Sequence, residues 1–95
     1  MSKIFNLLPV GEENAVSLKA LSAQTGLPER ALRSQIVAEL EDGSSCLSSC
    51  KPHGGYYRPA AGEKGLKEMQ RFYQQERSRA SSTFRKLKAI RRTLT

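Results

Sequence analysis

The sequence predicts a mainly α-helical protein with one small β-hairpin and a long C-terminal helix. Apolar residues recur at helical spacing in two stretches between residues 18 and 41, and Gly54 and Gly55 separate two short strand-like runs. Residues 66–95 contain neither proline nor glycine. A chain of 95 residues with 38% hydrophobic residues and no tryptophan supports one modest core, built mainly from Leu, Ile, Val and Ala.

The N-terminal region contains two short elements. Residues 3–8 are expected to form a helix with Ile4, Leu7 and Leu8 on one side, and Pro9 ends it. After a polar turn over residues 11–14, Ala15 and Val16 are expected to form a very short edge strand.

Two helices joined by a tight turn follow. Ser17 can cap a helix over residues 18–25, and Gly26 can end it in the left-handed conformation. Pro28 suits the first turn of the next helix, where its missing amide hydrogen is no loss. We expect Leu27 to fill the angle between the two helices.

The second helix of this pair is expected over residues 28–41. A spacing of four predicts its buried stripe, which consists of Leu32, Ile36 and Leu40, with Val37 at the edge. The opposite face carries Arg30 and Ser34, and Arg33 lies on the flank.

A β-hairpin is expected over residues 46–58. Its strands lie at 46–50 and 56–58, and we expect Gly54 and Gly55 to provide the positive φ angles of the tip. Tyr56 and Tyr57 point to opposite faces of a regular strand. One should therefore pack on the helix over residues 28–41, and the other should lie outward.

The remaining residues predict one long helix over 63–94. Its main apolar residues keep a spacing of three, four or seven, interrupted by Glu76 and Thr83; they are Leu66, Met69, Tyr73, Ala80, Leu87 and Leu94. At about 1.5 Å per residue this helix extends beyond a domain of sixty residues, which cannot cover the stripe. We therefore expect a homodimer through this helix, with a domain at 1–61 and a basic amphipathic helix at 62–95.

The net charge of +7 belongs entirely to the C-terminal third. Residues 1–62 carry six bases and six acids, whereas residues 63–95 carry ten bases, three acids and no acid after Glu76. This balance indicates a polyanionic partner. Three interpretations of the basic helix are open: contact with DNA phosphates, pairing with its own copy, or amphipathic binding to an acidic protein or membrane surface. Ser78 and residues 81–83 dilute the apolar face, which disfavours the membrane.

A helix, a short strand, two helices around a tight turn and a hairpin succeed one another over roughly residues 4–60. The stretches that carry this pattern are 17–21, 25–30, 32–33, 41–43 and 54–57. They resemble the winged helix-turn-helix superfamily of small bacterial and phage DNA-binding proteins. The resemblance implies a recognition helix over 28–41, in the major groove, and a wing over 46–58, on the DNA backbone.

The expected function is non-enzymatic binding of double-stranded DNA by a regulator of the bacterial or phage type. In the recognition helix Arg30 and Arg33 can each donate two hydrogen bonds to guanine, and Ser34 and Gln35 can bond to bases or backbone. Lys51 and His53 are expected to contact DNA at the wing tip, together with the exposed amides of the two tip glycines. The expected auxiliary phosphate contacts are Arg85, Lys88, Arg91 and Arg92.

An alternative stays open at this point. Arg30 and Arg33 could solvate a helix face by pairing with Glu29, Glu41 or Asp42, and the first 62 residues have no net charge. A domain without net charge would suit a winged-helix protein-interaction module in a phage, transcription or replication assembly. Transcription regulation, replication initiation and phage packaging all use such modules, and the residues select neither one of these roles nor a target sequence.

Other function classes find no support. One histidine, no convergent pair of carboxylates and no phosphate-binding glycine loop argue against an enzyme, a cofactor and a small-molecule substrate. Cys46, Cys50 and His53 lack a fourth ligand for zinc, so no metal is expected. A strand of four residues separates the two cysteines by about 13 Å, beyond the roughly 7 Å limit of a disulfide. Without a signal peptide or an apolar run of about 18 residues, we expect a cytoplasmic protein with no membrane partner.

Overall fold

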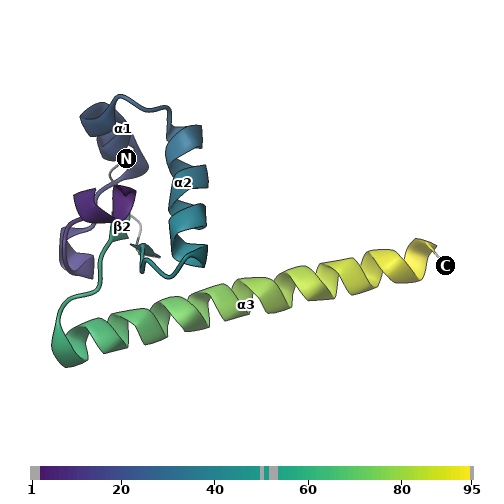
Figure 1. The fold of residues 1–95 in the computed structure, drawn as a ribbon. Helices are drawn as coiled ribbons and strands as arrows, with labels where there is room; N and C mark the ends of the chain where they lie inside the picture. Colours follow the sequence, from purple (N-terminus) through teal and green to yellow (C-terminus); the bar gives the residue numbers. More distant parts are fainter. Residues whose placement is uncertain (1–2, 50, 52–53, 95) are drawn as a thin grey trace.

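The chain is mainly helical, with one two-stranded antiparallel sheet and a long C-terminal helix. The computed structural model describes residues 3–49, 51 and 54–94. Its elements, in order, are η1 (Ile4–Leu7), η2 (Glu12–Asn14), α1 (Leu18–Thr25), α2 (Glu29–Glu41), β1 (Leu47–Ser48), β2 (Tyr56–Tyr57) and α3 (Gly62–Leu94). The elements from η1 to β2 pack together as a head, and α3 runs along one side of the head and projects far beyond it (Figure 1).

The N-terminal segment forms a single 3-10 turn, η1, instead of the expected helix over residues 3–8. Six residues are too few to sustain an independent α-helix, and this turn is held by α2. Oε2 of Glu39 accepts a hydrogen bond from the Ile4 amide and Oε1 accepts one from the Phe5 amide, both at 2.8 Å. Leu7, expected to face inward, is exposed, while Leu8 follows the turn in an extended conformation and enters the core.

The boundaries of α1 agree with the prediction. The Ser17 hydroxyl accepts a hydrogen bond from the Ala20 amide at 3.0 Å, and Gly26 ends the helix in the left-handed conformation at φ 79°. Two hydroxyl groups then fix the turn into α2: that of Ser22 donates to the Leu27 carbonyl at 2.6 Å, and that of Thr25 accepts from the Leu27 amide at 3.2 Å.

Two expectations about this turn are wrong. Leu27 does not fill the angle between the helices, because the hydroxyl bonds hold its backbone while its side chain stays 44% exposed. Pro28 has an extended backbone and occupies the N-cap position of α2, which begins one residue later than expected, at Glu29.

The core lies between α1, α2, η1 and the start of the hairpin. Leu21, Leu32 and Ile36 are at most 3% exposed, and the cluster is completed by Ile4, Leu8 and Cys46. This arrangement confirms the stripe predicted for α2, with Leu40 half-buried and Val37 exposed at its edge. Each fully buried side chain of this size contributes about 1.5–3 kcal/mol. Leu32 and Ile36 lie on one face of α2, so this face supplies most of the apolar burial that holds the helix.

The hairpin is shorter than expected and its glycines act differently. Leu47 pairs with Tyr57 and Ser48 with Tyr56, and Val16 forms the expected edge contact as a single bridge to Tyr56. Gly54 and Gly55 are half-buried and do not belong to the positive-φ glycines of the structure. A Cβ atom at Gly55 would collide with the Val16 carbonyl, so this glycine is needed for close approach between the edge residue and β2.

Both tyrosines of β2 are covered. Tyr56 packs against the core cluster, as predicted for one of the two. Tyr57 was expected to lie outward, yet it is 2% exposed. Its side of the sheet faces α3, because Tyr57 lines one groove together with Phe72 and Gln75 of that helix.

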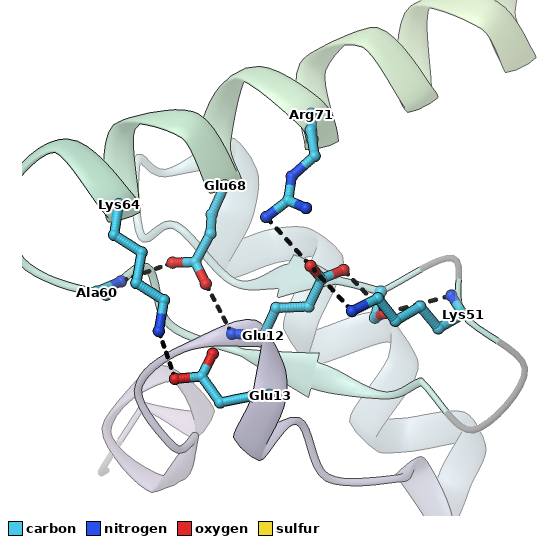
Figure 2. Close-up of polar contacts among 8 residues, drawn as sticks. Glu12, Glu13, Lys51, Ala60, Lys64, Glu68 and Arg71 are labelled. Atoms are coloured by element: carbon cyan, nitrogen blue, oxygen red, sulfur yellow. Dashed lines mark hydrogen bonds and ion pairs between the residues drawn. The ribbon is translucent and has the colours of Figure 1, made fainter.

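The first turns of α3 dock on the head through Gly65 and Glu68, which are both buried. Figure 2 shows the Glu68 carboxylate between two backbone amides, accepting from Glu12 at 2.7 Å and from Ala60 at 2.8 Å. Gly65 allows the backbone of Ala60 to lie directly against the helix, where a Cβ atom would collide with the Ala60 carbonyl. These contacts fix where α3 leaves the head.

Beyond this docking site α3 exposes its apolar stripe. The exposed fractions are 51% for Leu66, 61% for Tyr73 and 55% for Leu87, and they reach 80% at Leu94. The head therefore leaves the stripe uncovered, as the sequence predicts. Within the described ranges, no helix combines the length and apolar character needed to cross a membrane.

Candidate nucleic-acid interface

The exposed side of α2 brings together three of the four residues expected to read DNA. Arg30, Arg33 and Ser34 line one shallow hollow on the helix surface, together with Val37. They lie there because Leu32 and Ile36, on the other side of the same helix, are held in the core. The hollow thus presents two guanidinium groups and one hydroxyl, a set of donors that suits base edges and phosphates.

Gln35, the fourth residue, does not join this group. Its side-chain nitrogen donates a hydrogen bond to Oε2 of the buried Glu39 at 2.8 Å. This contact holds Gln35 on the opposite flank of α2 from Arg33 and gives its amide a structural partner.

Lys51, the described side chain among the expected wing contacts, lies beside α3. Lys51 is exposed, and its ammonium group lies 3.9 Å from the Glu12 carboxylate, which also pairs with Arg71 at 3.2 Å (Figure 2). The Gly54 amide, expected to be available for a phosphate, donates to the Lys51 carbonyl at 2.8 Å. His53 lies outside the described residues.

The expected phosphate contacts of the last helix lie far along α3, on the part that projects from the head (Figure 1). Arg85, Lys88, Arg91 and Arg92 are all exposed. Spacings of three and four place Arg85, Lys88 and Arg92 on one face of the helix, and Arg91, three residues after Lys88, lies at the edge of this face. The structure therefore separates the described candidate residues into a cluster on α2, Lys51 at the hairpin and a second cluster on distal α3.

A groove between α2 and α3 adds a residue that the sequence did not reveal. It encloses about 210 Å³, and Ile36, Leu40 and Phe72 contribute apolar lining. Arg33 of α2 and Arg79 of α3 both line this groove. The only sequence signal for Arg79 is its place in the basic helix, because its proximity to Arg33 depends on how α3 crosses the head.

Glu39 is the second residue that the sequence did not reveal. It lies on the buried side of α2, away from the exposed side that carries the candidate interface. It is 3% exposed. Burial would raise the pKa of this carboxyl group, but the Phe5 amide, the Gln35 side chain, the Ile4 amide and the Lys3 charge hold the pKa below its ordinary value. Its position three residues after Ile36 was the available signal.

Cys46 is a buried free thiol in the core. Burial raises the pKa of Cys46 to about 11, and the negative charge of Glu39, 3.9 Å from the sulfur, adds to this effect. A protonated buried thiol is a poor nucleophile and a poor metal ligand. Cys50 lies outside the described residues, and within the described part no three His, Cys, Asp or Glu side chains are placed to hold a metal ion.

Comparisons of the chain with protein-family models, with curated proteins and with solved structures give no match.

Proposed function

We propose that this chain is a non-enzymatic double-stranded DNA-binding protein with a winged helix-turn-helix head, in which α2 is the recognition helix. The observation that carries the proposal is the grouping of Arg30, Arg33 and Ser34 on the exposed side of α2. Two arginines and a hydroxyl on one rigid helix match the donors that major-groove readout requires. The role as a regulator of bacterial or phage DNA follows from the sequence resemblance alone.

The arrangement of the head supports the winged-helix assignment. α1 and α2 are joined by a three-residue turn, and the antiparallel hairpin follows α2 directly. Val16, which precedes α1, pairs with β2 through two backbone hydrogen bonds of 3.0 and 2.7 Å to Tyr56. A short strand before the helix pair that joins the hairpin after it is the arrangement expected of a winged helix.

The test is a titration of random-sequence duplex DNA at two salt concentrations. Phosphate neutralisation gives an affinity that falls steeply as salt rises. Arg30→Ala and Arg33→Ala should each weaken binding and reduce the salt slope by about one.

Charge-preserving variants are the matched controls. Arg30→Lys and Arg33→Lys keep the phosphate attraction, so the slope on random DNA should stay near that of the parent chain. On a selected specific site the lysine variants should still lose about 1–3 kcal/mol, because an ammonium group cannot replace a bidentate guanidinium. Absence of binding to any duplex at about 50 mM salt contradicts the proposal.

One observation favours a second function, docking of a protein on the same face. Val37 lies within the hollow and is 49% exposed, and α2 also exposes Glu29 and Glu41. A face of mixed charge around an apolar residue suits a protein partner. If no duplex binds, a protein-interaction module becomes the better explanation of this face.

A further inference from the structure

The exposed stripe of α3 follows a seven-residue repeat. The first position of the repeat is occupied by Leu66, Tyr73, Ala80, Leu87 and Leu94. The position three residues later is occupied by Met69, Glu76, Thr83 and Ile90. We call these nine positions the seam. A repeat of this kind over four heptads is the pattern by which helices pair side by side.

The head contacts mainly the neighbouring face of α3. It reaches the seam at Met69, whose sulfur lies 4.0 Å from the Ser45 hydroxyl, and at Glu76, which lines the groove toward α2. Gly65, Glu68 and Phe72 face the head, about 100° around the helix from the centre of the seam. The large apolar side chains of the seam range from 37% exposed at Met69 to 80% at Leu94. The seam is therefore accessible along most of its length while the head stays docked, with Met69 and Glu76 at its edge toward the head.

We propose that a second copy of this chain covers the seam, and that the two α3 helices run antiparallel. The charge distribution along α3 selects this direction. Residues 62–76 carry three bases and three acids, whereas residues 77–94 carry seven bases and no acid. A parallel pair would place the two basic halves side by side, whereas an antiparallel pair places each basic half beside a neutral one.

The small and polar seam residues select the register. In an antiparallel pair the first heptad position faces the second position of the other helix. Pairing Leu66 with Ile90 of the second copy also pairs Met69 with its Leu87. The same register places Glu76 opposite Ala80, which leaves room for the carboxylate. Arg79 of the second copy then lies beside Glu76 of the first. Within one chain, Arg79 also donates a hydrogen bond to the Glu76 carboxylate at 3.1 Å.

This pairing places both heads on the same side of the helix pair. The two-fold axis is perpendicular to the plane of the two helices, and each head lies about 100° from its own seam. The basic side chains of the outer face, which include Lys67, Arg85 and Lys88, point away from the seam and stay accessible. The pairing does not depend on DNA, so it is tested without nucleic acid.

Sedimentation equilibrium of the full chain at tens of micromolar tests the pairing. The expected result is a dimer, and Leu87→Asp should raise the dissociation constant at least about tenfold, because it places a charge in the seam. Ser81→Asp, the matched control, adds the same charge to the outer face and should leave the dimer intact. A monomeric parent chain, or a Leu87→Asp variant that dimerises like the parent, overturns the proposal.

The direction of the helices is tested by a distance between two spin labels. Thr93→Cys carries the label in a chain that also contains Cys46→Ala and Cys50→Ser. Antiparallel pairing about residue 78 separates the two labels by about 45 Å, at 1.5 Å per residue. A parallel pair brings them to about 10 Å, and that result overturns the antiparallel assignment.

Discussion

Glu39 and Glu68 perform the same task at two places in the head: each buried carboxylate accepts hydrogen bonds from two backbone amides of other segments. Glu39 of α2 binds the amides of Ile4 and Phe5, and Glu68 of α3 binds those of Glu12 and Ala60. The two side chains are 3% and 0% exposed. Each helix thereby holds an N-terminal 3-10 turn in place.

The physical reason is the supply of unpaired amides at the start of such turns. The first N–H groups of a helical turn have no partner within the turn, and a carboxylate is a strong acceptor for them. Burying a charge is costly without such bonds. The two glutamates and the two turns therefore stabilise one another, and neither would be stable in this position alone.

Glu68→Gln is expected to loosen the attachment of α3 to the head. A carboxamide has a single oxygen, which can accept from one of the two amides, and its NH₂ group then faces the second amide. That second buried amide is left unpaired, at a cost of about 1–3 kcal/mol. Hydrogen exchange should show reduced protection at the Glu12 and Ala60 amides. Glu63→Gln, on an exposed position of the same helix, is the control and should leave both amides protected.

The ionisation of Glu39 should make stability depend on pH. Its pKa is lower in the folded chain than its ordinary value of 4.5, so the folded state favours the ionised form. The stabilisation is fully present above this ordinary value and is lost as the pH falls through the lower folded pKa. Urea unfolding at a fixed protein concentration should therefore show a midpoint that drops as the pH falls below 4.5.

Glu39→Gln separates this effect from general acid unfolding. The variant should be less stable than the parent at pH 7 by about 1–3 kcal/mol, and the difference should shrink in acid. Glu41→Gln, two residues along α2 and exposed, removes an equal charge and should leave the pH dependence unchanged. Equal pH profiles for the parent and Glu39→Gln would contradict the assignment.

Gly65→Ala should destabilise the chain although it favours a helix. In an exposed helix interior the change from glycine to alanine gains about 1 kcal/mol. Here the added Cβ atom would collide with the Ala60 carbonyl, and that atom belongs to the backbone and must move. Overpacking of this kind costs about 1–3 kcal/mol, so the net effect should be a lower urea midpoint.

The control for Gly65→Ala is a change that improves helix propensity without a collision. Ser81→Ala lies on an exposed position of α3 and should raise the midpoint slightly. A Gly65→Ala variant that is more stable than the parent would show that residues 59–61 do not press on the helix.

Local signals in the sequence account for the elements that agree with the prediction. The Ser17 cap and the Gly26 terminus fix α1, and the absence of proline and glycine after Gly65 fixes α3. The stripe containing Leu32 and Ile36 decides which side of α2 is exposed, and so brings the arginines of the candidate interface together. These features depend on residues only a few positions apart.

The features that the sequence did not predict depend on contacts between distant segments. Tyr57 is buried on the side of the hairpin along which α3 passes, and Leu27 is exposed because two hydroxyls of α1 hold its backbone. Gln35 is exposed, as expected of a polar residue on α2, yet only the structure shows that its amide binds Glu39. Glu39, a charged residue three positions after Ile36 of the apolar stripe, was the one local signal that pointed to such a contact.

The basic face of distal α3 should supply affinity for DNA without supplying sequence preference. Arg85, Lys88 and Arg92 are exposed on one face of the projecting helix, away from the cluster on α2. If they bind phosphates, changing the three to glutamine should lower the salt slope of binding by about 0.9 for each phosphate that is no longer neutralised. All duplexes should be weakened about equally, because base edges are read elsewhere.

The measurement is a pair of salt slopes, for the parent and for the triple variant, on the same duplex. A variant with Lys3→Gln and Lys19→Gln removes charge from the head at exposed positions outside α2 and controls for the lower net charge. Per charge removed, its slope should change less than that of the triple variant, because a phosphate contact releases counterions locally, whereas net charge acts only through a screened long-range field. Equal slopes for the parent and the triple variant would remove distal α3 from the DNA interface. In that case the seven bases of residues 77–94 would either bind an acidic protein or form a solvated helix end, and the preference of α2 among sequences would be unaffected.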